Sequence, residues 1–383
     1  MGLRAVKVRL YLNTEQKQKI NSLIGASRFV YNKCLGFKID AYKMIGASTS
    51  IKHTSEMLSH VLRPTYEWLN EPHLNTKVLK AELMNLEQAY KNFFNHGSGF
   101  PKFKSKKNNQ SVRFPLEAVS NTPFKDGKIN LTKHINELKF RTSLKDKQLL
   151  LDNKNNIKSV TVSKSKTGKY YASFLLNVTE LREYIEPIND SIGIDLGIKS
   201  FLVASTGEVV ENLKFFRTQE KKIKRLHRDL SKKKKKSKNR EKSRLKLAKA
   251  YEKVTNRRND YLHNITTKIV NENQVIILED LNVKGMIKNH KLAKAIQEVG
   301  WGEFKRQILY KSNWLNRDVV FIDRFYPSSK TCSCCGDVKK KLNLSERIFK
   351  CDCGNEMDRD LNAALNIHNE GVRLYNIQTD TSV

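Results

Sequence analysis

The sequence predicts an α+β protein with more than one domain. Its 383 residues are enough to bury two or three hydrophobic cores. Some segments alternate apolar with polar residues, which is typical of half-buried strands, and others repeat apolar residues every three or four positions, which is typical of amphipathic helices. Strand-like segments come first with a helical insertion, whereas later segments alternate helix with strand. We therefore expect two domains of different construction.

The first domain is expected over residues 1–190. Residues 6–12 alternate apolar and basic side chains, which indicates a strand with one buried face. Residues 13–95 carry helical stripes and predict a helical bundle inserted into a β domain. Residues 97–185 are expected to be mostly β and to continue the sheet that the first strand begins. A linker is expected at residues 186–190.

The second domain is expected over residues 191–370. Its expected elements are a β-hairpin over residues 192–204 and 209–210, a charged helical region over about 215–271, a strand at 275–278, a helix at 295–315 and a strand at 319–322. Antiparallel strands followed by alternating helix and strand are typical of an RNase H-like α/β layer. Residues 371–383 are expected to form a flexible tail.

The composition points to a polyanionic partner. The chain has 72 Lys and Arg against 39 Asp and Glu, which gives a formal charge of +33. Nucleic acid is the leading candidate for such a partner, and a membrane surface is the weaker alternative. The sequence contains no run of about eighteen apolar residues that could cross a bilayer, and residues 1–12 lack the apolar block of a signal peptide. We expect a cytoplasmic protein.

Three short motifs each place a carboxylate where a metal-dependent nuclease needs one. Asp195 and Glu279 stand at or just past the end of apolar, β-branched runs, and Asp360 opens a helical segment. Three acidic side chains that converge repel one another, so such a fold is favoured mainly around divalent cations. Two cations about 3.5–4 Å apart are the usual means of hydrolysing a phosphodiester by in-line attack of water. The sequence thus predicts a two-metal catalytic site at these carboxylates.

Two neighbouring carboxylates compete for these roles. Asp280 follows Glu279 directly, and strand alternation puts the two on opposite faces, so only one of them can point into a site. Asp358 competes with Asp360 in the same way, although Asp358 is also a candidate helix cap. Each acidic residue also has an ordinary interpretation as a turn or strand-end residue that faces solvent. These alternatives are open at the level of sequence.

Five of the six cysteines are crowded into one short segment, which indicates metal binding rather than disulfides. Two close pairs, each followed by glycine, are separated by residues 336–350, as in a zinc ribbon. The expected ligands of one structural Zn²⁺ are Cys332, Cys335, Cys351 and Cys353. Cys334 is expected to be a bystander, although its position allows exchange with Cys335. Four thiolates leave no coordination position for water, so the zinc would be structural.

Two basic segments are candidate contacts to nucleic acid. Residues 221–258 predict a helical hairpin with a lysine-rich tip, and their one-signed charge favours phosphate contact over a merely solvated surface. In the other segment, Phe100, Phe103 and Phe114 interleave with lysines, so the rings could stack on bases or equally could pack the β core. The candidate nucleic-acid contacts are Lys102, Lys104, Lys106, Lys232, Lys233 and Lys234.

Taken together, these motifs closely resemble the TnpB, or OrfB, family of bacterial insertion sequences, relatives of type V CRISPR nucleases. The resemblance covers about residues 4–370. The segments that carry it are Lys7–Leu12, Arg28–Asn32, Pro101–Lys106, Gly193–Gly197, Leu278–Leu281, Pro327–Gly336 and Asp358–Ile367. One departure is the second cysteine pair, which has one intervening residue where many relatives have two.

The resemblance implies an RNA-guided endonuclease. The expected fold is an N-terminal, wedge-like β-barrel with the helical bundle as a recognition segment, then a RuvC-like nuclease domain with a zinc ribbon inserted at about residues 328–356. The family triad falls on Asp195, Glu279 and Asp360, which would bind two Mg²⁺ ions. A noncoding RNA from the transposon end would guide cleavage of double-stranded DNA beside a short motif, in a bacterial cytoplasm and at the nucleoid when DNA is bound.

Two rival functions remain open at this stage. One is a nuclease-silent, RNA-guided DNA-binding regulator on the same fold, which the loss of a triad carboxylate would mark. All three carboxylates are present. The other is a transposase that joins DNA strands, although the sequence shows no His-hydrophobic-His motif with a nucleophilic tyrosine. A strand-transfer assay would separate the nuclease from the transposase.

Overall fold

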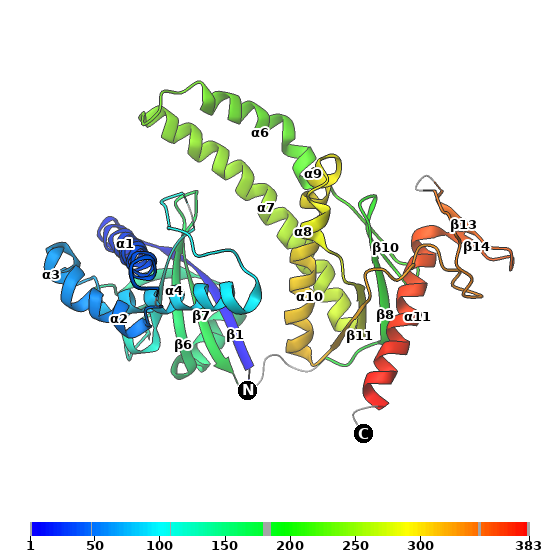
Figure 1. Ribbon diagram of the computed structural model, residues 1–383, viewed down its shortest axis with the longest axis horizontal. Helices are drawn as coiled ribbons and strands as arrows, with labels where there is room; N and C mark the ends of the chain where they lie inside the picture. The colour runs from blue at the N-terminus through cyan, green and yellow to red at the C-terminus, as the bar shows by residue number, and fades with distance from the viewer. Residues whose placement is uncertain (1, 47, 108, 179–184, 344–345, 381–383) are drawn as a thin grey trace. The chain divides into compact units, whose positions relative to one another are not determined.

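The computed structural model describes residues 2–46, 48–107, 109–178, 185–343 and 346–380. The chain divides into two compact units, Met1–Leu181 and Arg182–Val383 (Figure 1). The division precedes the linker that the sequence predicts at residues 186–190. Asn189 and Asp190 belong instead to a strand of the second unit, because Asn189 enters a parallel ladder opposite Asn273.

A seven-stranded sheet forms the first unit, and its recorded strand pairs are all antiparallel. The order is β2-β6-β7-β1-β5-β4-β3. The strands are β1 (Gly2–Tyr11), β2 (Gln110–Pro115), β3 (Phe124–Lys125), β4 (Lys128–Ile129), β5 (Leu138–Arg141), β6 (Ile157–Lys164) and β7 (Tyr170–Val178). Within the described residues no strand pairing joins β2 to β3, so closure into a barrel remains a prediction.

The helices of the first unit are inserted between β1 and β2, as the sequence predicts. They are α1 (Thr14–Ile45), α2 (Ile51–Glu56), the π-helical turn η1 (Met57–Leu62), α3 (Arg63–Thr65), the 3-10 turn η2 (Glu67–Asn70) and α4 (Thr76–His96). Three short elements follow between the strands, namely η3 (Leu116–Ala118), α5 (Leu144–Asp152) and η4 (Lys154–Asn156). The buried faces of α1, α4 and the sheet share one hydrophobic core.

A five-stranded sheet is the centre of the second unit. Its strands are β8 (Asn189–Leu196), β9 (Ser200–Ala204), β10 (Val209–Glu211), β11 (Asn273–Glu279) and β12 (Asp318–Ile322), in the order β10-β9-β8-β11-β12. The first three strands form an antiparallel meander, and β11 pairs in parallel with both β8 and β12. This order, with a meander first and crossovers after it, is the one that the sequence pattern predicts.

Helices cover both faces of this sheet (Figure 1). They are α6 (Phe215–Ser231), α7 (Lys238–Glu272), α8 (Val283–Met286), α9 (His290–Val299), α10 (Trp301–Leu315) and α11 (Arg359–Asp380). Ile276 and Leu278 pack in one core with α7 and α10, whereas Ile277 packs in another with Ile367 of α11. The alternation along β11 therefore assigns α7 and α10 to one face and α11 to the other.

Two helical expectations need correction. The helix expected over residues 295–315 is interrupted at Gly300, whose positive φ of 79° ends α9 and begins α10. The expected flexible tail is wrong up to residue 380, because α11 continues to Asp380. Val372 and Leu374 pack with the α11-side core of the sheet, so this part of the chain has apolar contacts that a loose tail would lack. Residues 381–383 lie outside the described residues.

Candidate active site and metal centre

Asp195 and Glu279 lie at the carboxyl ends of two adjacent parallel strands. In the ladder between β8 and β11, Gly193 lies opposite Ile277 and Ile194 opposite Leu278, and Asp195 and Glu279 are the next residues along the two strands. Glu279 has the same strand parity as Ile277, which faces α11. Asp195 has the same parity as Gly193, which is in close contact with His368 of α11. Both carboxylates are therefore on the face that α11 covers.

Asp360 comes to this site from the first turn of α11. Its competitor, Asp358, is used as a helix cap: its Oδ1 accepts hydrogen bonds from the backbone N–H groups of Asp360 at 2.9 Å and Leu361 at 3.2 Å. The Asp360 carboxylate lies close enough to Asp195 to raise the pKa of the Asp195 carboxyl. The structure thus brings together Asp195, Glu279 and Asp360, which are far apart in sequence.

The electrostatics of the three carboxylates favour a cation. Burial, the charge of Glu279 and the charge of Asp360 raise the pKa of Asp195 to about 7, although Arg359 acts in the opposite direction. Burial also raises the pKa of Glu279. These groups are costly to ionise together without a positive counter-charge, and carboxylate oxygens are the ligands that Mg²⁺ prefers. The three residues therefore fit a site for divalent cations.

Asp280 is engaged elsewhere, on the opposite face of the strand. It pairs with Lys305 of α10 at 2.8 Å and with Arg324, and both cations lower the pKa of the Asp280 carboxyl. Because α10 and α11 cover different faces of the sheet, Asp280 points away from Asp195. Of the two adjacent carboxylates, Glu279 is therefore the one on the same face as Asp195.

Three polar residues that the sequence analysis did not single out for a role support the site. The Ser328 hydroxyl donates a hydrogen bond of 2.6 Å to Glu279 Oε1. Asn362 and Asn366 are buried on α11, and their amides bind the backbone of residues 328–333. The spacing of the two asparagines was a usable signal, because polar residues four apart occupy one face of a helix. Without a structure, nothing shows what that face contacts.

The four predicted cysteine ligands also meet. The ligand atoms of Cys332, Cys335, Cys351 and Cys353 all lie within 4.8 Å of one another. Gly336 and Gly354 each adopt a positive φ, of 80° and 89°, where the chain turns after each pair. The hairpin that closes the second pair consists of β13 (Ile348–Lys350) and β14 (Glu356–Asp358). Cys334 is exposed and lies outside this cluster.

The surroundings of Cys332 suit a metal-bound thiolate. Although burial opposes ionisation, hydrogen bonds from the backbone of Cys335 and Cys334 and from the Asn355 side chain lower the pKa of Cys332 to about 6. The Asn355 Nδ2 lies 3.4 Å from the Cys332 sulfur. Four clustered sulfurs, one of them in such a setting, match the donor set of a tetrahedral zinc site.

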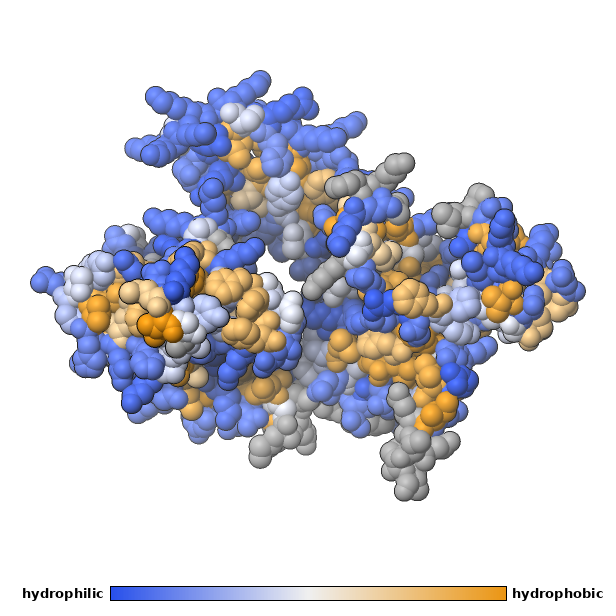
Figure 2. Space-filling model, viewed as in Figure 1, coloured by the Kyte–Doolittle hydropathy of each residue, from blue (hydrophilic) through white to orange (hydrophobic). Residues whose placement is uncertain are grey.

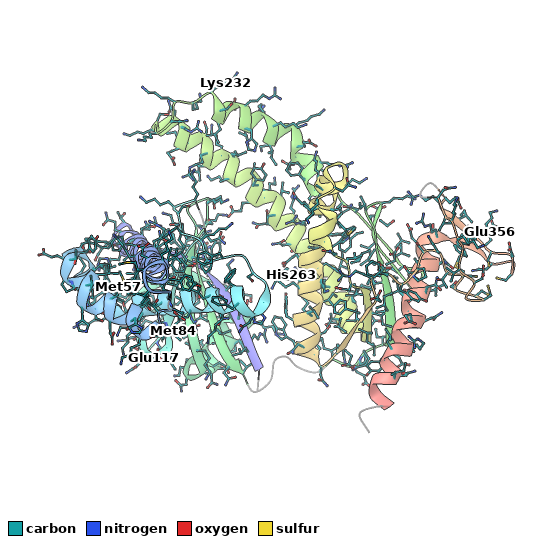
Figure 3. All side chains as sticks on the ribbon, viewed as in Figure 1. Met57, Met84, Glu117, Lys232, His263 and Glu356 are labelled. Carbon is teal, nitrogen blue, oxygen red and sulfur yellow. The ribbon has the colours of Figure 1, made fainter. Side chains whose placement is uncertain are left out.

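The lysine-rich tip is the exposed end of a helical hairpin. Ile223 of α6 shares a small hydrophobic core with Leu247 and Val254 of α7. Arg240 donates hydrogen bonds to backbone carbonyls at the end of α6 and in the tip, which holds the turn in place. Lys232, Lys233 and Lys234 are all exposed there. Figure 3 shows Lys232 at the end of the hairpin, and hydrophilic side chains surround that end in Figure 2.

The three candidate lysines of the second basic segment, Lys102, Lys104 and Lys106, have different surroundings. Lys102 and Lys106 are exposed, but Lys104 forms an ion pair of 2.6 Å with the buried Glu82 and lies over the Tyr31 ring. Asn32 also holds the Lys104 backbone through hydrogen bonds to both its N–H and its carbonyl. Lys104 therefore has structural partners within the first unit, and its role as a phosphate contact stays a prediction.

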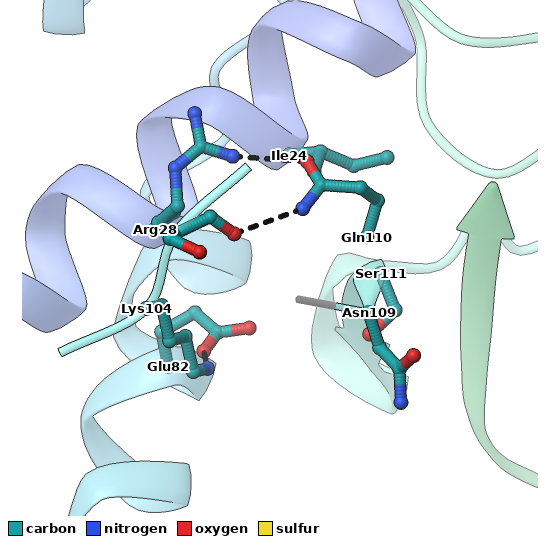
Figure 4. Close-up of a pocket in the computed structure, with 8 residues that line it drawn as sticks. Ile24, Arg28, Glu82, Lys104, Asn109, Gln110 and Ser111 are labelled. Atoms are coloured by element: carbon teal, nitrogen blue, oxygen red, sulfur yellow. Dashed lines mark hydrogen bonds and ion pairs between the residues drawn. The ribbon is translucent and has the colours of Figure 1, made fainter. Parts of the chain in front are cut away.

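The aromatic residues of the same segment divide between the two interpretations. Phe114 is fully buried in the core of the first unit. Phe103 is 57% exposed, and Phe100 is 46% exposed while it packs edge-on against Tyr90 and Phe93. Beside this segment lies a cavity of about 260 Å³ (Figure 4), lined by Ile24, Arg28, Glu82, Lys104, Ser105, Asn109, Gln110 and Ser111.

Comparison with known proteins decides the family. A model described as "Probable transposase" (OrfB_IS605) matches residues 173–290, and one described as "Cas12f1-like, TNB domain" matches residues 301–367. A protein of Streptomyces pristinaespiralis is 36% identical over 95% of this chain and 88% of its own length. InsQ of Escherichia coli K12 is 30% identical over 95% of this chain and 91% of its own length. The chain belongs to the TnpB (OrfB) family. Both relatives carry the name "Putative RNA-guided DNA endonuclease".

Solved structures show that the TnpB chain shares a fold with small CRISPR nucleases. The Cas12f1 chain of a Cas12f1–sgRNA–target DNA complex aligns with a TM-score of 0.57, covering 92% of this chain and 81% of that one at 16% identity. The mini-RNA-guided endonuclease CRISPR-Cas_phi3 aligns with a TM-score of 0.51 at 10% identity, covering 96% of this chain and 92% of that one. At these identities the likeness concerns the fold alone.

A third family model, described as "Helix-turn-helix domain", matches residues 1–46 of the TnpB chain. Those residues form strand β1 and the single long helix α1, so the segment does not adopt a helix-turn-helix here. Among the described residues, none of the helices has both the length and the apolar character needed to cross a bilayer.

Proposed function

We propose that this protein is an RNA-guided DNA endonuclease that cleaves double-stranded DNA with two Mg²⁺ ions. The observation that supports it best is the convergence of Asp195, Glu279 and Asp360 at one edge of the second sheet. Burial, together with the nearby charges of Glu279 and Asp360, raises the pKa of Asp195 to about 7. Such a cluster costs stability unless cations bind it. The names of the two long relatives point to the same activity.

Each element of the site has a role in this proposal. Asp195, Glu279 and Asp360 would hold the ions, and bound ions would supply the means to activate a water molecule and to stabilise the leaving oxygen. Ser328 orients the Glu279 carboxylate through its hydrogen bond. Asp358 caps α11 and thereby fixes the first turn that carries Asp360. The four cysteines would hold one structural Zn²⁺ beside this helix.

The positive charge of the chain is suited to binding guide RNA and target DNA. In an RNA-guided enzyme, base pairing reads the target sequence, so the protein mainly needs positive charge to hold the nucleic acids. The formal charge of +33 and the exposed lysine tip of the α6–α7 hairpin are suited to a guide RNA and its DNA target. We assign the first unit, with its inserted helices, to recognition of the motif beside the target, for which residues 49–82 supply candidate side chains.

The test is guided cleavage of a plasmid. The protein is expressed with its downstream flanking DNA, and the purified particle receives, in Mg²⁺, a plasmid with a guide match beside a randomised motif. Asp195→Ala should abolish linearisation while DNA binding persists. Asp280→Asn is the matched control, because that carboxylate lies on the other face of β11, and it should still cut.

Other outcomes would replace the proposal. Binding without cutting in both the wild type and Asp195→Ala would make the protein a guided DNA-binding regulator. Joined rather than linearised products would make it a strand-transfer transposase. Cleavage that Asp195→Ala retains would remove the three carboxylates from the mechanism.

A further inference from the structure

One short segment touches both the carboxylate cluster and the cysteine cluster. Within residues 327–333, Ser328 donates its hydroxyl hydrogen bond to Glu279 at 2.6 Å, and four positions later Cys332 contributes its sulfur to the cysteine cluster. Both residues are nearly inaccessible to solvent, with exposed fractions of 6% and 1%. We call residues 327–333 the connecting segment.

Two buried amides of α11 fix the connecting segment. Asn366 Nδ2 donates to the carbonyls of Ser328 at 2.8 Å and Thr331 at 2.6 Å. Asn362 donates to the Thr331 carbonyl at 2.7 Å and accepts a hydrogen bond of 3.0 Å from the Ser333 N–H. The helix that carries Asp360 therefore also holds the backbone on either side of Cys332.

This network has little freedom to adjust. The exposed fractions of Asn362 and Asn366 are 0% and 3%, so water cannot replace a hydrogen bond that either amide loses. A displacement of Cys332 would pull on the Thr331 carbonyl, which both asparagines bind, and on the Ser333 N–H, which Asn362 binds. Because Asn366 binds the carbonyls of both Thr331 and Ser328, we expect such a displacement to reach Ser328.

We propose that occupancy of the cysteine cluster by zinc sets the affinity of the carboxylate cluster for divalent cations, and that Ser328 is the positioning residue that couples them. The inference rests on the proposed function only in that the carboxylates bind divalent cations. With zinc bound, the connecting segment holds Ser328 against Glu279 and aligns that carboxylate for the ions. Loss of such a second-layer hydrogen bond typically weakens metal binding about 10–100-fold.

The first experiment measures Mn²⁺ binding to the full-length, zinc-loaded protein by electron paramagnetic resonance, without nucleic acid. Ser328→Ala should weaken binding about tenfold or more, and Ser328→Thr, which keeps the hydroxyl, should restore it. Ser333→Ala is the matched control, because its hydroxyl lies near Met357 Sδ at 3.6 Å rather than near Glu279, and its affinity should equal that of the wild type. Equal affinities for Ser328→Ala and the wild type would overturn the proposal.

The second experiment asks whether zinc acts through Ser328. Zinc is withdrawn with a thiol-reactive reagent and a chromogenic chelator that reports its release, and Mn²⁺ binding is measured again. The wild type should lose about tenfold in affinity, whereas Ser328→Ala should show little further loss. Ser328 does not couple the sites if the Mn²⁺ affinity of the wild type is unchanged by zinc removal. The same conclusion follows if zinc removal lowers the Mn²⁺ affinity of Ser328→Ala as much as that of the wild type. If zinc removal unfolds the second unit, the Ala and Thr variants with zinc bound still decide the role of Ser328.

Failure of this proposal differs from failure of the proposed function. If Mn²⁺ binds and responds to Ser328 but no guided cleavage occurs, the coupling stands and the endonuclease assignment falls. If guided cleavage occurs while Ser328→Ala binds Mn²⁺ like the wild type, the endonuclease assignment stands and the coupling is wrong. If the wild-type protein binds no Mn²⁺ at the carboxylates, both are wrong.

Discussion

Gly193 of β8 lies directly beneath His368 of α11. A Cβ added at Gly193 would stand 2.5 Å from the His368 Cβ and 2.6 Å from the Ala364 carbonyl oxygen. Real Cβ atoms do not approach other atoms so closely, so only glycine allows the helix to rest on the strand. This contact sets the distance between α11 and the sheet, and α11 carries Asp360 to the end of β8, where Asp195 lies.

Gly193→Ala should therefore destabilise the second unit. The added methyl must push α11 away from β8, and overpacking of this kind costs about 1–3 kcal/mol. Thermal unfolding followed by circular dichroism measures the effect. Gly302→Ala is the control: Gly302 lies in α10 with nothing within 4 Å of an added Cβ, so this variant should be as stable as the wild type or slightly more stable.

Asp195→Asn should raise the melting temperature in the absence of added divalent cations. In the folded chain the pKa of Asp195 is raised from 3.8 to about 7, so ionisation lowers stability as pH rises through that interval. The amide removes this cost. We expect a gain of about 1–3 kcal/mol at pH 8 that shrinks toward pH 5 and vanishes near pH 4.

Asp280→Asn should shift stability in the opposite direction. Its carboxyl has a pKa that Lys305 and Arg324 lower, so its ionised form is favoured by folding. Replacement should lower the melting temperature at pH 8, measured for both variants by thermal unfolding followed by circular dichroism. An equal rise for both variants would mean that loss of either carboxylate stabilises the chain, so the rise for Asp195→Asn would not be specific to its raised pKa.

Cys351→Ser should release the metal from the cysteine cluster and destabilise the chain around Asp360. Zinc content measured by mass spectrometry should fall from about one ion per chain to near zero. The loss in stability should be about 3 kcal/mol or more, because structural zinc supplies folding free energy directly. Cys334→Ser is the matched control, since Cys334 is exposed and outside the cluster, and it should keep its zinc.

Replacing Lys232, Lys233 and Lys234 together with glutamine should weaken nucleic-acid binding in a salt-dependent way. Each phosphate contact contributes about 0.7–0.9 to the slope of log K against log salt. Loss of three contacts should reduce that slope by about 2, measured by fluorescence anisotropy with duplex DNA and with the guide RNA between 50 and 200 mM salt. An unchanged slope would mean that the exposed tip only faces solvent.

Lys104→Gln serves as the contrasting variant in that assay. It leaves the buried Glu82 without its cation, so the first unit should lose about 1–3 kcal/mol of stability after allowance for solvent at Lys104. The salt slope should stay as in the wild type, because this ammonium group is already paired. A reduced slope would confirm Lys104 as a phosphate contact.

Much of the candidate site could be predicted from the sequence, because its chemistry is local. Apolar runs that end in Asp195 and Glu279 identify strand ends, and the spacing of Cys332, Cys335, Cys351 and Cys353 identifies a thiolate cluster. Lys104 shows the limit of such patterns. Its basic, aromatic-rich surroundings favour a phosphate contact, yet it also pairs with a buried carboxylate, that of Glu82 on α4, which no local pattern reveals.

By itself the sequence determined the order of the elements, the positive charge and the residue types of both clusters, because periodicity, composition and spacing act over short stretches of chain. Only the tertiary structure decided which carboxylate faces which helix. The choice between Glu279 and Asp280 depends on α10 and α11 covering opposite faces of β11. The link from Cys332 through Asn366 to Ser328 and Glu279 likewise exists only after folding, since hydrogen bonds join groups that are near in space, whatever their separation along the chain.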